Sequence, residues 1–297
     1  MRMKVGSSTG SLIQKFGDEQ TIIKLAEAGF DCIDFGCFHY SIHSADSIFN
    51  QNEDKFKAYF THLGEVAANA GIEIGQIHSP MPSYTGKADE DEFLFGIQKK
   101  SIKAAAYMNS KYIIIHPCIP GQYRYNHYRK ECKKINMEFY RKLLPALVKY
   151  NVKLAVENMF NYDPVRKCIC PTVCTTADEM ADYIDTLNDE HFVACLDVGH
   201  AHLTGDTPEN MARILGSRLE TLHIHDNNGL NDEHKIPYHG NINWNNFIEV
   251  LPEINYKGSF SFEADSFFTM YGGMLPEECA RFLCKLGNEM VNSKNDG

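Results

Sequence analysis

Short apolar runs alternate with amphipathic stretches along the whole chain. The apolar runs predict eight strands, at 3–8, 32–36, 72–78, 112–116, 153–157, 192–197, 219–225 and 258–263. The amphipathic stretches predict eight helices, at 18–29, 54–70, 90–109, 127–150, 176–187, 207–217, 243–254 and 275–292. Short strands that are apolar throughout are typical of parallel sheets covered by helices. Strict strand–helix alternation, eight times over, predicts an α/β fold, a single closed (β/α)8 TIM barrel.

Neither a linker nor a low-complexity segment interrupts this alternation, so we expect one TIM-barrel domain, residues 1–297. The longest stretches expected to be irregular follow the second, fourth, fifth and seventh strands, at 37–52, 117–127, 159–175 and 226–242. In a βα-barrel these loops emerge on the face that carries the active site. We therefore expect them to determine the substrate.

Composition narrows the class of protein. The 297 residues are 43% hydrophobic, which is ample for a buried core. No apolar run approaches the roughly 20 residues of a membrane span, and the first ten residues predict a strand and a turn rather than a signal peptide. A net charge of −10 gives no general affinity for nucleic acid or anionic membranes, so neither is an expected partner. We expect a cytoplasmic protein.

Ten cysteines fit a reducing compartment, and several lie inside predicted strands, where they would be small buried hydrophobes. Cys168, Cys170 and Cys174 form a tighter C-x-C-x3-C group. We interpret it as a cysteine-bearing loop, because no fourth ligand is obvious and the spacing is not that of a zinc ribbon. A soft-metal or redox role for this group stays open.

Four of the predicted strands end in a residue that can bind a metal: Glu157, Asp197, His223 and Glu263. A single carboxylate at a strand end is often a partner in an ion pair. Four such ends converge on one face of a barrel, and carboxylates held close together repel one another unless a cation compensates them. We therefore predict that these four residues bind one divalent cation.

Five more groups of the same kind follow strand ends: His78, His116, His200, Asp232 and His234. A lone histidine at a strand end is usually a hydrogen-bonded core residue. Five groups aimed at one barrel mouth are too many for that interpretation alone. They would bind additional metal ions or hold the hydroxyl groups of a substrate.

The motifs from residue 153 onward resemble those of the xylose isomerase-like TIM barrel superfamily, which includes sugar phosphate isomerases and epimerases and the second family of apurinic endonucleases. The motifs are E-N at Glu157, L-D-x-G-H at 196–200, H-x-x-D-N at 223–227, D-x-H-x-x-P at 232–237, G-x-I-N-W at 240–244 and the final Glu263. The resemblance implies a metal held by Glu157, Asp197, His223 and Glu263. His225 stands where the family often has Lys or Asn, so His223 is preferred as the ligand.

Comparison with two branches of the superfamily bears on which substrate this protein would take. Endonuclease IV binds three zinc ions through nine ligands, and all nine corresponding positions carry a ligand type here: His78, His116, Glu157, Asp197, His200, His223, Asp232, His234 and Glu263. The loops after the first three strands lack the basic, intercalating set that a DNA minor groove needs. The free-ketose 3-epimerases have a second Glu and an Arg where this chain has Asp163 and Gly229.

The favoured hypothesis is a metal-dependent isomerase or epimerase that acts on a sugar, sugar phosphate or related polyol through a metal-stabilised enediolate. Glu157 and Glu263 would transfer the protons, and one Mn²⁺, Mg²⁺, Co²⁺ or Zn²⁺ would be the cofactor. Metal-assisted lyase or dehydratase chemistry and phosphodiester hydrolysis of the endonuclease IV type stay open.

The loop that carries Tyr123 and Arg124 is rich in Tyr. With Phe38, His39, Tyr40 and His43 it would wall a sugar pocket, since aromatic rings cover sugar faces and still form hydrogen bonds. A solvated loop or a contact in a homo-oligomer explains the same residues.

Overall fold

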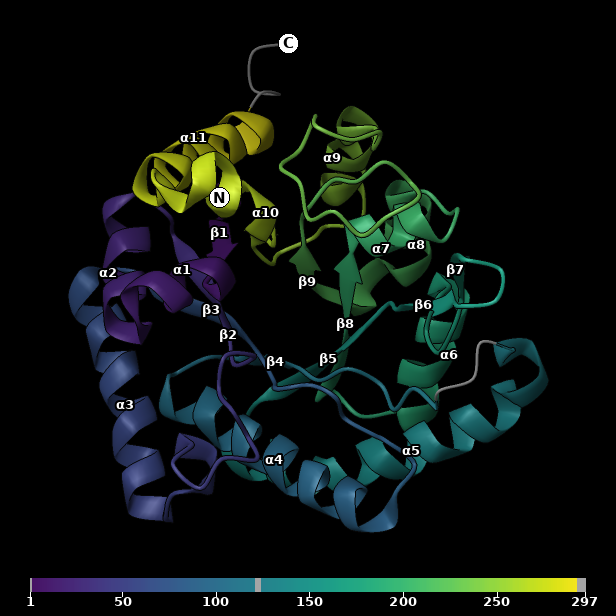
Figure 1. Cartoon of the computed structure of the whole chain (residues 1–297). Coiled ribbons are helices and arrows are strands. Elements are labelled where there is room, and N and C mark those ends of the chain that lie inside the picture. The colour runs from purple at the N-terminus through teal and green to yellow at the C-terminus, as the bar shows by residue number, and fades with distance from the viewer. Residues whose placement is uncertain (1, 121–123, 293–297) are drawn as a thin grey trace.

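The computed structural model describes residues 2–120 and 124–292, in which eight parallel strands form a barrel surrounded by helices (Figure 1). The barrel strands are β1 (Val5–Ser8), β2 (Cys32–Gly36), β3 (Glu73–His78), β4 (Tyr112–Ile114), β5 (Lys153–Glu157), β8 (Phe192–Asp197), β9 (Leu219–His223) and β10 (Phe260–Phe262). They pair in the order β10-β1-β2-β3-β4-β5-β8-β9, and a parallel bridge between Ile224 and Phe262 joins the two ends. The predicted α/β barrel of eight parallel strands is confirmed.

Eight helices correspond to the predicted ones: α2 (Asp18–Glu27), α3 (Glu53–Ala70), α4 (Ala88–Tyr107), α5 (Tyr125–Tyr150), α6 (Ala177–Leu187), α8 (Pro208–Leu215), α9 (Trp244–Glu253) and α11 (Pro276–Asn292). Polar caps set several of their ends. Thr176 and Thr207 accept hydrogen bonds from the first turns of α6 and α8, and Gly71 takes the left-handed conformation that ends α3.

Several short elements were not predicted. They are the helices α1 (Gly10–Phe16), α7 (Val198–Leu203) and α10 (Asp265–Thr269), the 3₁₀ turns η1 (Ile48–Asn50), η2 (Gly216–Arg218) and η3 (Met270–Gly273), and the strands β6 (Phe160–Asp163) and β7 (Cys168–Pro171). The prediction of an irregular segment at 159–175 was therefore wrong in part, because β6 and β7 form an antiparallel hairpin there. These strands are largely exposed, so no apolar alternation marks them.

All ten cysteines are free, and two of the C-x-C-x3-C group lie on this hairpin. Cys168 is exposed and Cys170 half-buried on β7, whereas Cys174 is buried beyond the hairpin. None of the helices in the described ranges is both long enough and apolar enough to cross a membrane.

The barrel interior is small and polar compared with the layer between strands and helices. Inside the barrel, the buried apolar cluster consists of Ile114, Ala155, Val193 and Cys195. A cavity of about 820 Å³ opens at the N-terminal strand ends, where Gly75 and Thr221 contribute to its lining. No predicted metal ligand lines this cavity. The polar residues with the candidate chemistry lie at the other end of the strands.

Close packing of α3 on the end of α4 gives a stability prediction. A Cβ atom on Gly64 would lie 3.0 Å from the Met108 Cα and 3.2 Å from the Tyr107 backbone oxygen, neither of which can turn away. Gly64→Ala should therefore lower the free energy of unfolding by about 1 kcal/mol or more, because overpacking costs about 1–3 kcal/mol and the gain in helix propensity is smaller. Urea unfolding followed by circular dichroism measures the change.

The matched control is Gly96, which lies inside α4, where a Cβ atom would have no other atom within 4 Å. Gly96→Ala should raise the free energy of unfolding by about 0.5–1 kcal/mol, because only helix propensity changes. Equal effects of the two substitutions would contradict the packing argument.

Candidate metal centre

The C-terminal ends of four barrel strands bring the predicted metal ligands together. Glu157, Asp197 and His223 are the last residues of β5, β8 and β9, and Glu263 directly follows β10. Parallel pairing sets Asp197 opposite His223, so their side chains share one face of the barrel. All four residues are buried, and each offers a ligand atom that lies within 4.8 Å of the others.

The imidazole of His223 is surrounded by the three carboxylates. Its Nδ1 atom lies 3.0 Å from Glu157 Oε1, 3.5 Å from Glu263 Oε2 and 3.8 Å from Asp197 Oδ2. A nitrogen and three carboxylate oxygens at this spacing form a donor set that zinc, manganese or cobalt accepts.

A carboxylate behind His223 anchors the ring, and sequence reasoning missed it. Asp34 Oδ2 lies 3.0 Å from the Nε2 atom of His223 and accepts a 2.9 Å hydrogen bond from Gln76 Nε2. A carboxylate beside Nε2 favours a proton on that nitrogen and leaves Nδ1 as the atom that would face a metal, the arrangement that orients many metal-binding histidines. The available signal was a carboxylate in the middle of an otherwise apolar strand, CIDFG.

The E-N and D-x-x-H motifs fasten the ends of β5 and β8 to each other. Asn158 accepts a 2.7 Å hydrogen bond from the Asp197 backbone N–H and donates a 2.8 Å bond to the Asp197 carbonyl. The His200 backbone N–H donates to Asp197 Oδ1 at 2.7 Å, so this carboxylate also caps α7. These contacts fix where the Asp197 side chain points.

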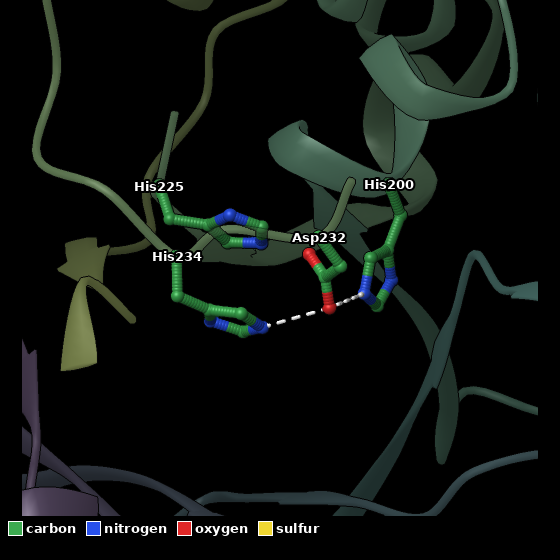
Figure 2. Close-up of side chains that lie close together, drawn as sticks. All are labelled: His200, His225, Asp232 and His234. Atoms are coloured by element: carbon green, nitrogen blue, oxygen red, sulfur yellow. Dashed lines mark hydrogen bonds and ion pairs between the residues drawn. The ribbon is translucent and has the colours of Figure 1, made fainter. Parts of the chain in front are cut away.

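A second group of ligand atoms lies beside the first. His200, His225, Asp232 and His234 offer atoms within 4.8 Å of one another. Figure 2 shows Asp232 between His234 and His200, with distances of 3.0 Å and 3.8 Å from its Oδ2 atom to their Nε2 atoms. Sequence reasoning placed His225 behind His223 as a candidate, and the structure adds it to this second group.

The two remaining predicted histidines flank Glu157 on its other side. His116 Nε2 lies 3.0 Å and His78 Nε2 3.4 Å from Glu157 Oε2. His78, Glu157 and His223 form a third group of ligand atoms within 4.8 Å. Glu157 therefore stands at the junction of two groups.

Burial and the surrounding histidines act differently on the two glutamates. Burial acts to raise the pKa of Glu157, but the charges of His223 and His116 and their hydrogen bonds hold it well below its usual range. Burial raises the pKa of Glu263, and the charges of His223 and His234 only partly offset that effect. Two carboxylates in one site thus have different proton affinities, as acid–base catalysis requires.

The histidines of the second group are basic because of their carboxylate neighbours. Burial disfavours the charged form of His200, but Asp197 and Asp232 raise its pKa to about 10. Burial acts the same way on His234, whose hydrogen bond with Asp232 contributes to a pKa of about 11. Both rings therefore favour the protonated form at neutral pH, and its charge offsets that of the neighbouring carboxylates.

Aromatic side chains at the mouth only partly match the predicted pocket wall. Phe38 packs on His78 with ring centroids 4.4 Å apart, and Phe160 of β6 packs edge-on to His200 at 4.9 Å. Phe160 was not predicted, because its strand was not. His39 and Tyr40 instead bind Asp18 of α2.

Of three residues predicted to contact the substrate, Arg124 and His43 lie apart from the cluster and Tyr123 cannot be placed. Arg124 is exposed just before α5, and no contact joins it to the cluster within the part of the chain that the structure describes. His43 stacks on Phe93. Tyr123 lies outside the described residues.

Curated relatives of the chain include an uncharacterized protein of Methanocaldococcus jannaschii, 27% identical over 168 residues that cover 56% of this chain and 54% of that protein. The chain thus spans about half the length of the first curated relatives it matches. A D-psicose 3-epimerase of Ruminiclostridium cellulolyticum is 24% identical over 259 residues, 74% of this chain and 82% of the relative.

Solved structures agree with the fold over nearly the whole chain. A D-tagatose 3-epimerase-like protein has a TM-score of 0.74 at 22% identity, covering 98% of this chain and 99% of the other. The IolI protein, solved with a bound zinc atom, has a TM-score of 0.73 at 20% identity with the same coverage. The sequence profile of one family matches residues 22–278. The chain belongs to the xylose isomerase-like TIM barrel family.

Proposed function

We propose that this protein is a divalent-metal-dependent isomerase or epimerase that acts on a sugar, a sugar phosphate or a related polyol, with residues 1–297 as one domain. One observation carries the proposal: the His223 Nδ1 atom lies among the carboxylates of Glu157, Asp197 and Glu263, each from a different strand end. Similarity to a D-psicose 3-epimerase and to a zinc-binding barrel supports it.

The residues present fit a metal ion. Three buried carboxylates at this spacing repel one another, and a divalent cation is the natural compensation. Glu157, Asp197, His223 and Glu263 would hold it, while Asp34 keeps the His223 ring in the binding orientation. When bound, the metal supplies a Lewis acid that polarises a substrate carbonyl.

Glu157 and Glu263 would carry the protons. One carboxylate removes a proton from the carbon next to the substrate carbonyl, and the other returns a proton to the substrate. They stand at the ends of β5 and β10, with β8 and β9 between them in the barrel, so they reach the substrate from separate walls. His78 and His116 beside Glu157, together with the second group, would hold substrate hydroxyls.

The substrate would be held differently from that of the free-ketose 3-epimerases. Asp163, at the position of their second Glu, uses Oδ1 to accept hydrogen bonds from the backbone N–H groups of Val165 and Arg166, at 2.9 Å and 3.0 Å. It therefore closes the hairpin turn. Gly229 offers no side chain where they have Arg. We propose that the histidine-rich second group takes over these contacts.

A second candidate is metal-assisted hydrolysis of the endonuclease IV type. The observation that favours it is the convergence of all nine ligand-type positions into adjoining groups around Glu157 and Asp232. Three bound zinc ions would be expected in that case, against one metal ion for the sugar enzyme.

Metal binding gives the first prediction. Protein stripped with a chelator should unfold at a higher temperature after addition of Mn²⁺, Co²⁺ or Zn²⁺. The free energy of unfolding should rise by about 2.7 kcal/mol when the free metal concentration is 100 times Kd. Asp197→Asn should reduce this shift, because it removes a charge that offsets the cation. Asp46→Asn, at an exposed position, is the control. No shift with any of the metals would contradict the proposal.

Proton transfer gives the second prediction. Glu157→Gln and Glu263→Gln should each lower kcat on a sugar substrate by about 10²–10⁴, the usual contribution of a general acid or base. Glu65→Gln, on the exposed face of α3, should change nothing. Solvent deuterium should appear at the carbon next to the carbonyl. Turnover without exchange would favour a hydride shift instead.

Metal stoichiometry gives the third prediction and separates the two candidates. His116→Ala should leave about one metal ion per chain, measured by elemental analysis, while raising KM for the sugar, because His116 would hold substrate rather than metal. Abasic-site duplex DNA should not be cut at physiological salt, since the acidic chain lacks the charge for backbone contacts. Three zinc ions, loss of zinc in His116→Ala and robust incision would favour the nuclease.

A further inference from the structure

His225 is a fully buried member of the second group, and the proposed substrate contacts do not explain its bond to Asp197. It lies two residues beyond the end of β9 and is 0% exposed. Its Nε2 atom lies 3.0 Å from Oδ1 and 3.1 Å from Oδ2 of Asp197. Because an ionised carboxylate only accepts hydrogen bonds, His225 donates its Nε2–H to Asp197.

Two residues lie against the ring of His225. It stacks on His234, with ring centroids 4.0 Å apart and planes 11° from parallel, and Figure 2 shows the two rings one above the other. The second is Gly199, the glycine of L-D-x-G-H. A Cβ atom there would lie 1.9 Å from His225 Cε1, and the three nearest atoms all belong to this ring. A side chain at position 199 therefore displaces His225.

Gly199 is needed for space rather than for backbone conformation. It lies in α7 and is not among the described residues with positive φ, so alanine is acceptable to the backbone there. Gly199 and His225 thus form a pair, because the missing side chain of Gly199 leaves the volume that the His225 ring fills.

We propose that His225 is a positioning residue of the metal centre. It orients the Asp197 carboxylate toward the cation and connects this carboxylate to His234 through the stacked rings. The inference rests on the proposed metal-dependent function and deepens it. Asp197 receives the His200 backbone N–H on Oδ1, and His225 reaches both of its oxygens from another side. Together the two donors fix the rotation of the carboxylate.

Loss of a group that orients a metal ligand typically lowers metal affinity by about 10–100-fold. His225→Ala should therefore raise Kd for Co²⁺ or Zn²⁺ within that range, measured by competition with a chromophoric chelator, and should alter the visible spectrum of bound Co²⁺. His225→Gln should retain most of the affinity, because its amide N–H can still donate to Asp197. His191→Ala is the control, since His191 bonds Asp189 at the other end of β8.

A double-mutant cycle separates positioning from general destabilisation. Gly199→Ala should weaken metal binding in the wild-type background, because the added methyl group displaces the ring. In the His225→Ala background the same substitution should change Kd by less than about twofold, because coupling is lost when the partner is absent. Circular dichroism of the metal-free proteins checks that each variant is folded.

The outcomes are distinct. A wild-type protein that binds none of these metals overturns the proposed function and this inference together. A wild type that binds metal, with His225→Ala unchanged in affinity and Co²⁺ spectrum, overturns only the role of His225. Equal harm from Gly199→Ala in both backgrounds overturns the pairing of the two residues. Failure of His225→Gln to restore affinity overturns the hydrogen bond to Asp197 as its basis.

Discussion

Three carboxylates are buried around one imidazole at the C-terminal mouth of the barrel, and much of the structure follows from that constraint. Glu157, Asp197 and Glu263 each lose the hydration that an ionised carboxyl has in water, which is costly unless positive charge or hydrogen bonds replace it. His223 supplies both to Glu157, the rings of His200 and His234 add positive charge near Asp197 and Glu263, and a divalent cation would supply more. The mouth is therefore a place where positive charge is required before any substrate arrives.

Polar side chains inside the barrel fix the positions of the candidate metal ligands. Most barrels fill their interior with branched apolar side chains, whereas this one has a small apolar cluster and places Asp34 and Gln76 directly behind His223. Asn158 ties the ends of β5 and β8 together through backbone hydrogen bonds. These hydrogen bonds restrict the candidate metal ligands to one arrangement, although Oδ1 of Asp34 and Oε1 of Gln76 are buried without a hydrogen-bond partner among the described residues.

The side chains around the candidate centre differ from those of the free-ketose 3-epimerases at two positions. In this chain the position of a second epimerase glutamate closes a hairpin turn through Asp163, and Gly229 has no side chain to bind a hydroxyl. Phe160 on that hairpin and the group of Asp232 and His234 occupy the mouth instead. Under the proposed function, these differences predict substrate contacts unlike those of the free-ketose 3-epimerases.

The barrel and the set of candidate ligands could be predicted from the chain alone, because strand–helix periodicity and strand ends are local properties. Glu157, Asp197, His223 and Glu263 follow apolar runs, and parallel strands must bring such ends to one face. Short exposed elements such as β6 and β7 were not predicted, because they bury too few side chains to produce an apolar pattern in the sequence. The partners of the ligands emerged only in the folded molecule: Asp34 meets His223, and His225 fits against Gly199, across distances in sequence that no local pattern encodes. Which ring fills which space depends on packing between strands, and packing exists only in the folded chain.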